Sequence, residues 1–161
     1  MKQLVIVFGV CLVLGVPVAA LLQARPDFSG TWQFNQAESS PNVAGNTPTI
    51  PFPSQIVVKQ TSAELHVHST SVRQAPLDAV YKLDGSQVTV QAPSGISETG
   101  EARMEGARLV ITSRRSFTSP AGETVVEFTE VWTLNGDRLT IEKTRVQAGE
   151  SSSETAIFDR V

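Results

Sequence analysis

Apolar and polar residues alternate along most of the chain after residue 30, in short runs separated by turn residues. A period of two is typical of β-strands with one buried face, because successive side chains point to opposite faces of a sheet. The pattern predicts about ten strands. They lie near Thr31 to Asn35, Gln55 to Gln60, Ala63 to Thr70, Leu77 to Leu83, Gln87 to Gln91, Thr99 to Met104, Arg108 to Phe117, Thr124 to Leu134, Arg138 to Gln147 and Ser153 to Arg160.

Glycine-containing turns separate several of these strands. Asp84-Gly85 and Asn135-Gly136 each precede a short alternating segment, and both dipeptides are strong signals for a two-residue hairpin turn. If these two dipeptides, and likewise Glu105-Gly106 and Thr61-Ser62, are the centres of their turns, the register of the flanking strands follows. It pairs Trp132 with Leu139, Ala102 with Leu109, Val58 with Leu65 and Tyr81 with Val88.

The predicted fold is all-β. It is an antiparallel up-and-down meander of about eight to ten strands that closes into a barrel or a strongly curled sheet. An outer-membrane barrel is excluded, because its outer surface must be apolar. The outward positions here are instead polar, and include Lys59, Lys82, Thr89, Arg103, Thr112, Thr133, Thr140 and Glu142.

The first residues follow a different pattern. Residues 4–22 are almost purely apolar, follow Lys2 and end at small residues, which predicts a secretory signal peptide over residues 1–24. Cleavage is expected after Ala20 or Ala24, and an uncleaved membrane anchor is the alternative. The mature chain is then a single periplasmic or secreted domain, residues 25–161, with no membrane span. It also lacks Cys11, the single cysteine, so we expect neither a disulfide nor thiol chemistry.

Charge and composition narrow the function classes. The chain has 13 Lys and Arg against 16 Asp and Glu, for a formal net charge of −3, which excludes a basic nucleic-acid-binding domain. Its hydrophobic residues make up 40% of the total, enough to build a core rather than a disordered tail.

A proline-rich segment, residues 39–54, interrupts the meander. Long loops of this kind are often lids or binding loops. We therefore expect a flap over one mouth of the barrel that carries Ile50 and Phe52, with an ordinary surface loop as the alternative.

The face that the register turns inward also carries charged residues. One interpretation is an internal network in which Glu130 pairs with Lys143 or Arg115, because buried charges must be paired. The other is a ligand cavity in which Arg115, Lys143 and Arg145 bind a carboxylate or phosphate group of a lipid-like molecule. The residues expected to line that cavity are Tyr81, Arg115, Phe128, Glu130, Trp132, Lys143 and Arg145.

Signals for catalysis and metal binding are weak. His66 and His68 share one outward strand face, a spacing that can chelate a metal, but no third ligand is fixed beside them. No nucleophile elbow and no phosphate-binding loop is present. We therefore expect no metal and no cofactor, and an acid–base role for Glu98 and Glu130 is only a third alternative.

The segment Asp27-Phe28-Ser29-Gly30-Thr31-Trp32 opens the predicted mature chain. Gly30-Thr31-Trp32 resembles the G-x-W signature of lipocalins and related calycin barrels, and the hexapeptide resembles the start of small secreted bacterial proteins of unassigned function. The resemblance implies a barrel closed at one end by Trp32, with Arg160 of the last strand packed over the indole. It also implies non-catalytic binding of a small hydrophobic or amphipathic molecule. The alternative function is a protein-interaction or inhibitor module with a filled barrel, whose protein partner is unknown.

Overall fold

The computed structural model describes residues 25–40, 52–72, 75–90, 96–120 and 122–161. The predicted signal peptide therefore lies outside the described residues, and export stays a prediction. The described chain forms ten β-strands. They are β1 (Gly30–Asn35), β2 (Gln55–Gln60), β3 (Glu64–Thr70), β4 (Leu77–Lys82), β5 (Val88–Val90), β6 (Ile96–Glu105), β7 (Arg108–Ser119), β8 (Gly122–Asn135), β9 (Arg138–Gln147) and β10 (Glu150–Arg160).

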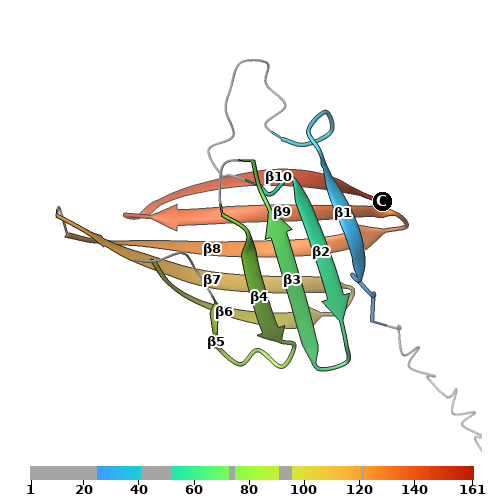
Figure 1. The fold of residues 1–161 in the computed structure, drawn as a ribbon, viewed down its shortest axis with the longest axis horizontal. Helices are drawn as coiled ribbons and strands as arrows, with labels where there is room; N and C mark the ends of the chain where they lie inside the picture. The colour runs from blue at the N-terminus through green and yellow to red at the C-terminus, as the bar shows by residue number, and fades with distance from the viewer. Residues whose placement is uncertain (1–24, 41–51, 73–74, 91–95, 121) are drawn as a thin grey trace, which may run out of the picture.

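All ten strands belong to one antiparallel sheet, in the order β4-β3-β2-β1-β10-β9-β8-β7-β6-β5. The first strand pairs with the last, so the sheet curls round on itself and leaves β4 and β5 as its two edges. The short strands β1 to β4 cross in front of the long strands β6 to β10 (Figure 1). The all-β meander expected from the sequence is thus confirmed as a nearly closed barrel. Within the described chain, no helix is long and apolar enough to cross a bilayer.

The hairpins use the predicted turn sequences, but in a different register. Trp132 pairs with Ile141 rather than Leu139, because Gly136 and Asp137, not Asn135 and Gly136, form the two-residue loop. Gly136 has φ 61° at the first central position, where a type II′ turn requires glycine. The hairpins at Gly106 and between β2 and β3 show the same shift of two residues. Since side chains alternate with a period of two, such a shift keeps every residue on its predicted face.

The hairpin predicted at Asp84-Gly85 does not form. Tyr81 does not pair with Val88, because β4 and β5 are separate edges of the sheet, and Val88 pairs with Gly100 instead. Asp84 makes only an isolated bridge to Arg103, and the Gly85 amide donates to the Ala102 carbonyl. The dipeptide therefore carries the chain across the opening between the two edges rather than closing a hairpin.

One end of the barrel is filled by large apolar side chains. The largest of those that are fully buried are Trp32, Trp132, Phe28 and Phe158, followed by Leu65, Leu109 and Leu139. Each contributes about 1.5 to 3 kcal/mol to folding through burial of apolar surface. Phe28 meets Trp132 edge to face, with the ring centroids 6.2 Å apart, which joins the segment before β1 to the opposite wall. These side chains close this end of the barrel interior.

Gly30, Trp32 and Arg160 form a single packing unit at that end. The Arg160 guanidinium lies 4.2 Å from the centroid of the Trp32 ring, and its Nη1 donates to the Ser29 carbonyl at 2.7 Å. A Cβ on Gly30 would lie 2.3 Å from the same Nη1, so the guanidinium would have to move, and the φ of 146° at Gly30 would strain any residue with a side chain. The spacing in Gly30-Thr31-Trp32 thus has a physical reason: glycine leaves the room in which arginine covers the indole.

The β9–β10 turn allows a stabilising substitution. Ala148 and Gly149 both have positive φ, 52° and 83°, as in a type I′ turn, and Ala148 is the only non-glycine residue in that region within the described chain. An L-residue with a Cβ is strained there, whereas asparagine tolerates the conformation. Ala148→Asn is expected to raise the free energy of unfolding by about 0.5 to 1 kcal/mol in urea denaturation. Ala107→Asn, in the Gly106 turn where φ is not positive, is the control, and an equal gain there would contradict the explanation.

Candidate functional site

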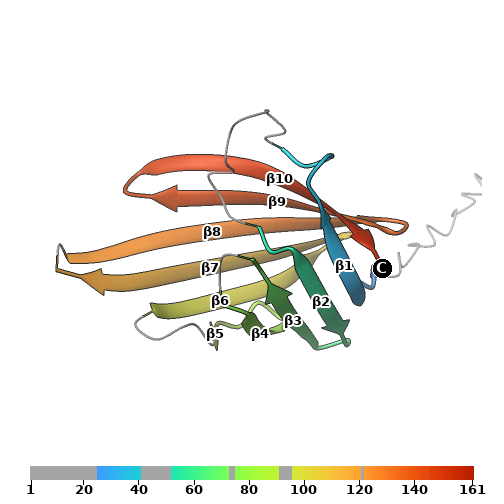
Figure 2. The same cartoon turned by 45° about the horizontal axis from the view of Figure 1, so that its top comes forward.

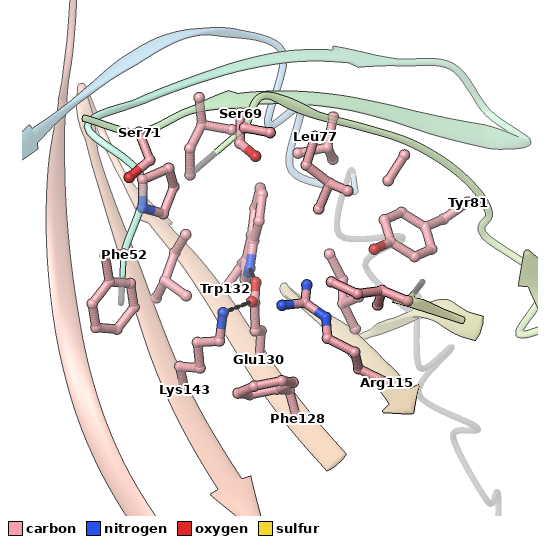
Figure 3. A pocket seen from close by; sticks show the side chains of 18 residues that line it. Phe52, Ser69, Ser71, Leu77, Tyr81, Arg115, Phe128, Glu130, Trp132 and Lys143 are labelled. Carbon is pink, nitrogen blue, oxygen red and sulfur yellow. Dashed lines mark hydrogen bonds and ion pairs between the residues drawn. The ribbon is translucent and has the colours of Figure 1, made fainter. Parts of the chain in front are cut away.

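Above the filled end, the interior contains a cavity of about 440 Å³. Its walls come from the short strands β2 to β4 on one side and from the long strands β7 to β9 on the other (Figure 3). The lining residues are Phe52, Pro53, Ile56, Val67, Ser69, Ser71, Ala75, Leu77, Ala79, Tyr81, Ile96, Ile111, Arg115, Phe128, Glu130, Trp132, Ile141 and Lys143.

Most of this wall is apolar. Ile56, Val67 and Ala79 contribute from β2, β3 and β4, and Ile111 and Ile141 face them from β7 and β9. These are the inward positions of the alternating strands, so the same period that builds the core also lines the cavity. Such a surface suits a hydrocarbon skeleton and leaves orientation to a few polar groups.

Glu130 and Lys143 form the first polar group, on neighbouring positions of β8 and β9. The Lys143 Nζ lies 2.9 Å from Glu130 Oε1, and the Trp132 indole N–H donates to Glu130 Oε2 at 2.9 Å. Burial by itself raises the pKa of Glu130. The Lys143 charge and hydrogen bond, the Trp132 N–H and the Arg115 charge outweigh it and hold the pKa below its ordinary value. Glu130 is therefore an ion-paired carboxylate, not the isolated carboxyl that acid–base chemistry at this position would need.

Arg115 and Glu98 form the second polar group, directly opposite each other on β7 and β6. The Arg115 Nε and Nη2 lie 2.8 and 2.7 Å from Glu98 Oε2. The Glu98 side chain is almost completely buried, whereas that of Arg115 is 30% exposed and lines the cavity. The Arg115 guanidinium also lies 5.8 Å from the centroid of the Phe128 ring. The Arg115 guanidinium thus has the Phe128 ring on one face and the Glu98 carboxylate on one edge.

Aromatic rings hold the Lys143 ammonium in place. Its Nζ lies 4.8 Å from the centroid of Phe128 and 5.9 Å from that of Phe52. Phe52 in turn stacks on Phe34 of β1, with centroids 6.1 Å apart. A cation between aromatic faces gains electrostatic energy from both. Phe52, expected in a lid, therefore forms part of the cavity wall, and Ile50 lies outside the described residues.

Tyr81 projects its hydroxyl into the cavity from β4 (Figure 3). The residue is only 6% exposed, yet among the residues that the structure describes the hydroxyl has no hydrogen-bond partner. Burial raises the pKa of Tyr81, and the negative charges of Glu130 and Glu98 raise it further against the opposing effect of Arg115. The phenol is therefore neutral, and it can both donate and accept a hydrogen bond.

Gly100 makes room for the Tyr81 ring. A Cβ on Gly100 of β6 would lie 2.6 Å from the Tyr81 Cε1 atom, closer than side-chain contacts allow. The ring therefore lies across the bare backbone of β6, on the far side of the opening between the two sheet edges. Tertiary packing, rather than a hairpin partner on β5, fixes the direction of the hydroxyl.

Of the residues expected in the cavity, the structure brings together Tyr81, Arg115, Phe128, Glu130, Trp132 and Lys143. Arg145 is not among the lining residues, and its guanidinium instead donates to the Gln147 side chain. Arg145 lies near the end of β9, and the long strands β8 and β9 continue beyond the ends of the short strands (Figure 2). Trp32 and Arg160 lie at the filled end, with the guanidinium over the indole ring.

The sequence interpretation missed most of the apolar wall and the partner of Arg115. The predicted register differs from the observed one by two residues, so it places neither Glu98 opposite Arg115 nor Glu130 opposite Lys143. The opposite charges at these positions were themselves a signal for the correct register, since cross-strand ion pairs stabilise a sheet.

The two histidines have carboxylate neighbours on the outer surface. His66 lies 3.3 Å from Glu64, and His68 lies 2.6 Å from Asp78, with all four side chains substantially exposed. Within the described residues, no group of three His, Cys, Asp or Glu side chains comes together to hold a metal ion.

Comparisons with known proteins bear on the fold. No protein-family profile and no curated protein sequence matches the chain. Among solved structures, it resembles the zebrafish ileal bile acid-binding protein in complex with cholic acid, with a TM-score of 0.56 and 13% identity over 83% of this chain and 98% of that one. It also resembles an abundant heat soluble (SAHS) protein from Ramazzottius varieornatus, with a TM-score of 0.51 and 14% identity over 83% of this chain and 95% of the other. The chain thus shares the lipocalin-like barrel fold of these proteins.

Proposed function

We propose that the protein is an exported binding protein that holds a small, largely hydrophobic molecule inside the barrel without catalysis. The cavity carries this proposal. Its volume of about 440 Å³ lies within the range of roughly 300 to 1,000 Å³ that is usual for small-molecule sites. Its wall is also of the usual kind, since apolar side chains dominate and a few polar groups converge from Tyr81, Arg115, Glu130 and Lys143.

The structural comparisons support the proposal at the level of the fold. The zebrafish protein is described as binding bile acid and was solved with cholic acid, so a protein of this fold can bind a small amphipathic molecule. The sequence identity of 13% carries no residue-by-residue correspondence. The ligand of the present chain must therefore be inferred from its own side chains.

Filling the cavity is expected to abolish binding. Ala79 lies on the cavity wall and is 4% exposed, so Ala79→Phe places a phenyl ring in the space that a ligand needs. We expect the affinity for the neutral dye Nile red, measured by its fluorescence, to fall at least tenfold. The matched control is Val80→Phe, at the next position of the same strand, whose side chain points outward and is 46% exposed.

Equal binding by both variants would contradict a cavity site, as would the absence of dye binding to the unaltered protein. Native mass spectrometry of protein purified from its own host provides an independent measurement, in which a co-purified molecule should be present in the unaltered protein and absent from Ala79→Phe. The alternative function, a protein-interaction module, was expected to have a filled barrel, and the open cavity does not favour it.

A further inference from the structure

We propose that the ligand presents an uncharged hydrogen-bonding group, a hydroxyl or carbonyl oxygen, to Tyr81, and that the cavity discriminates against carboxylates and phosphates. This inference rests on the proposed function and names the chemical class of the ligand. It departs from the expectation that Arg115, Lys143 and Arg145 receive an anionic group.

The charges around the cavity are already balanced by the protein. Arg115 is paired with Glu98 at 2.7 Å, and Lys143 is paired with Glu130 at 2.9 Å. A further carboxylate, Glu154, is 8% exposed and lies directly opposite Lys143 in the β9–β10 register. Arg145 lies beyond the lining residues. Among the residues that the structure describes, the cavity wall and its immediate partners therefore carry no surplus positive charge for an incoming anion.

The geometry of Arg115 reinforces this balance. A guanidinium recognises a carboxylate best through two parallel N–H groups. In this chain, Glu98 already occupies the edge formed by Nε and Nη2. A ligand carboxylate would enter a low-polarity space and meet Glu98 and Glu130 beside the two cations. Burial of a charge without a compensating partner is costly, whereas a neutral oxygen needs only a hydrogen bond.

The Tyr81 hydroxyl is the polar group of the cavity that is available to a ligand. Its side chain is more than nine-tenths buried, its hydroxyl points into the cavity, and no described residue pairs with it (Figure 3). The oxygen is open to the cavity, because no fully buried side-chain oxygen or nitrogen of the described chain lacks a partner, so a ligand oxygen can reach it and form a hydrogen bond with it. Because the phenol is neutral, a neutral hydroxyl or carbonyl is the partner that needs no further charge compensation.

The test compares two molecules with the same chain and different polar ends, dodecan-1-ol and dodecanoate. Their dissociation constants are measured at pH 7 by displacement of Nile red. We expect the alcohol to bind at least tenfold more tightly than the carboxylate. In Tyr81→Phe, the affinity for the alcohol should fall about three- to tenfold, the effect of one lost neutral hydrogen bond, while Nile red still reports an intact cavity.

Glu98→Gln provides the reverse test. The substitution keeps the shape of the side chain and releases the Arg115 charge, so we expect dodecanoate to bind at least tenfold more tightly than to the unaltered protein, with the alcohol changed by less than threefold. Glu101→Gln, an outward position on the same strand, is the matched control and should leave both affinities unchanged. If Glu98→Gln does not fold, as judged by circular dichroism, Glu130→Gln removes the other paired carboxylate and should likewise favour dodecanoate.

The outcomes separate the two proposals. If dodecanoate binds the unaltered protein as tightly as dodecan-1-ol or more tightly, the inference about a neutral ligand is overturned and the binding function stands. If Tyr81→Phe leaves the alcohol affinity unchanged, Tyr81 is not the recognition group and the inference fails in the same way. If neither molecule nor Nile red binds, the proposed binding function itself fails.

Discussion

Replacement of Trp32 by alanine is expected to lower the free energy of unfolding by about 3 to 5 kcal/mol. The indole is fully buried, and its N–H donates to the Phe28 carbonyl at 2.9 Å. The substitution therefore leaves a large cavity at the filled end, an unpaired buried carbonyl and an Arg160 guanidinium without the ring beneath it. Urea denaturation followed by circular dichroism measures the loss.

A second aromatic residue provides the control for that measurement. Phe117 on β7 is 37% exposed, so Phe117→Ala removes an aromatic ring that is less buried than the indole. Its expected cost is below about 1 kcal/mol. Arg160→Met removes the cation above the indole, worth about 0.5 to 2 kcal/mol, together with the hydrogen bond to the Ser29 carbonyl and the ion pair with Asp137. A loss below about 1 kcal/mol for Trp32→Ala would show that the barrel does not depend on its filled end.

Lys143→Met is expected to destabilise the protein at pH 7 by about 2 to 3 kcal/mol, because it leaves Glu130 without its cation. The estimate is below the range for completely buried pairs, since the Lys143 and Glu130 side chains are 16% and 22% exposed. The double variant Lys143→Met with Glu130→Met should recover most of the loss, because no unpaired charge then remains. Arg138→Met, which breaks exposed ion pairs with Glu38 and Asp159, is the control and should cost less than about 1 kcal/mol.

The pH dependence of this variant has a definite sign. In the unaltered protein, the pKa of Glu130 is lower in the folded state than in the unfolded state. Ionised Glu130 therefore stabilises the fold at pH values above its unfolded pKa, and this stabilisation is lost as the pH falls through the folded pKa. In Lys143→Met, burial is expected to dominate and to raise the pKa of Glu130 instead. The destabilisation by the unpaired Glu130 carboxylate then exists at neutral pH and disappears as the pH falls through the raised pKa, because the carboxyl becomes neutral. The difference in stability between the two proteins should therefore narrow toward pH 4, and a constant difference would contradict the explanation.

Several elements follow from local sequence because their determinants are local. The ten strands lie close to their predicted positions, since the alternation that reveals them is the same alternation that buries one face. The main differences are at the ends: β6 begins at Ile96 and β10 at Glu150, because long-range pairing extends strands into polar segments such as Ser151 to Ser153.

The register of the hairpins could not be predicted from the turn sequences alone. A two-residue loop at Gly136-Asp137 and one at Asn135-Gly136 are similar in sequence, and both keep Trp132, Glu130 and Phe128 facing inward. Only the pairing of complete strands distinguishes them. The distinction matters for the site, because one register places Glu130 opposite Ile141 and the other places it opposite Lys143.

The alternating pattern alone was sufficient to predict the all-β class, the number of strands, the inward face of each strand and most of the polar residues near the cavity. These properties depend on neighbours in sequence. The pairing of Arg115 with Glu98 and of Lys143 with Glu130, the opening between β4 and β5, and the exclusion of Arg145 from the cavity depend on which strands meet and how far each extends. The unpaired Tyr81 hydroxyl belongs to the same group, because the ring lies across Gly100 of a strand that is not its hairpin partner. Those features arise from contacts between segments far apart in the chain, and they determine which charges inside the barrel remain available to a ligand.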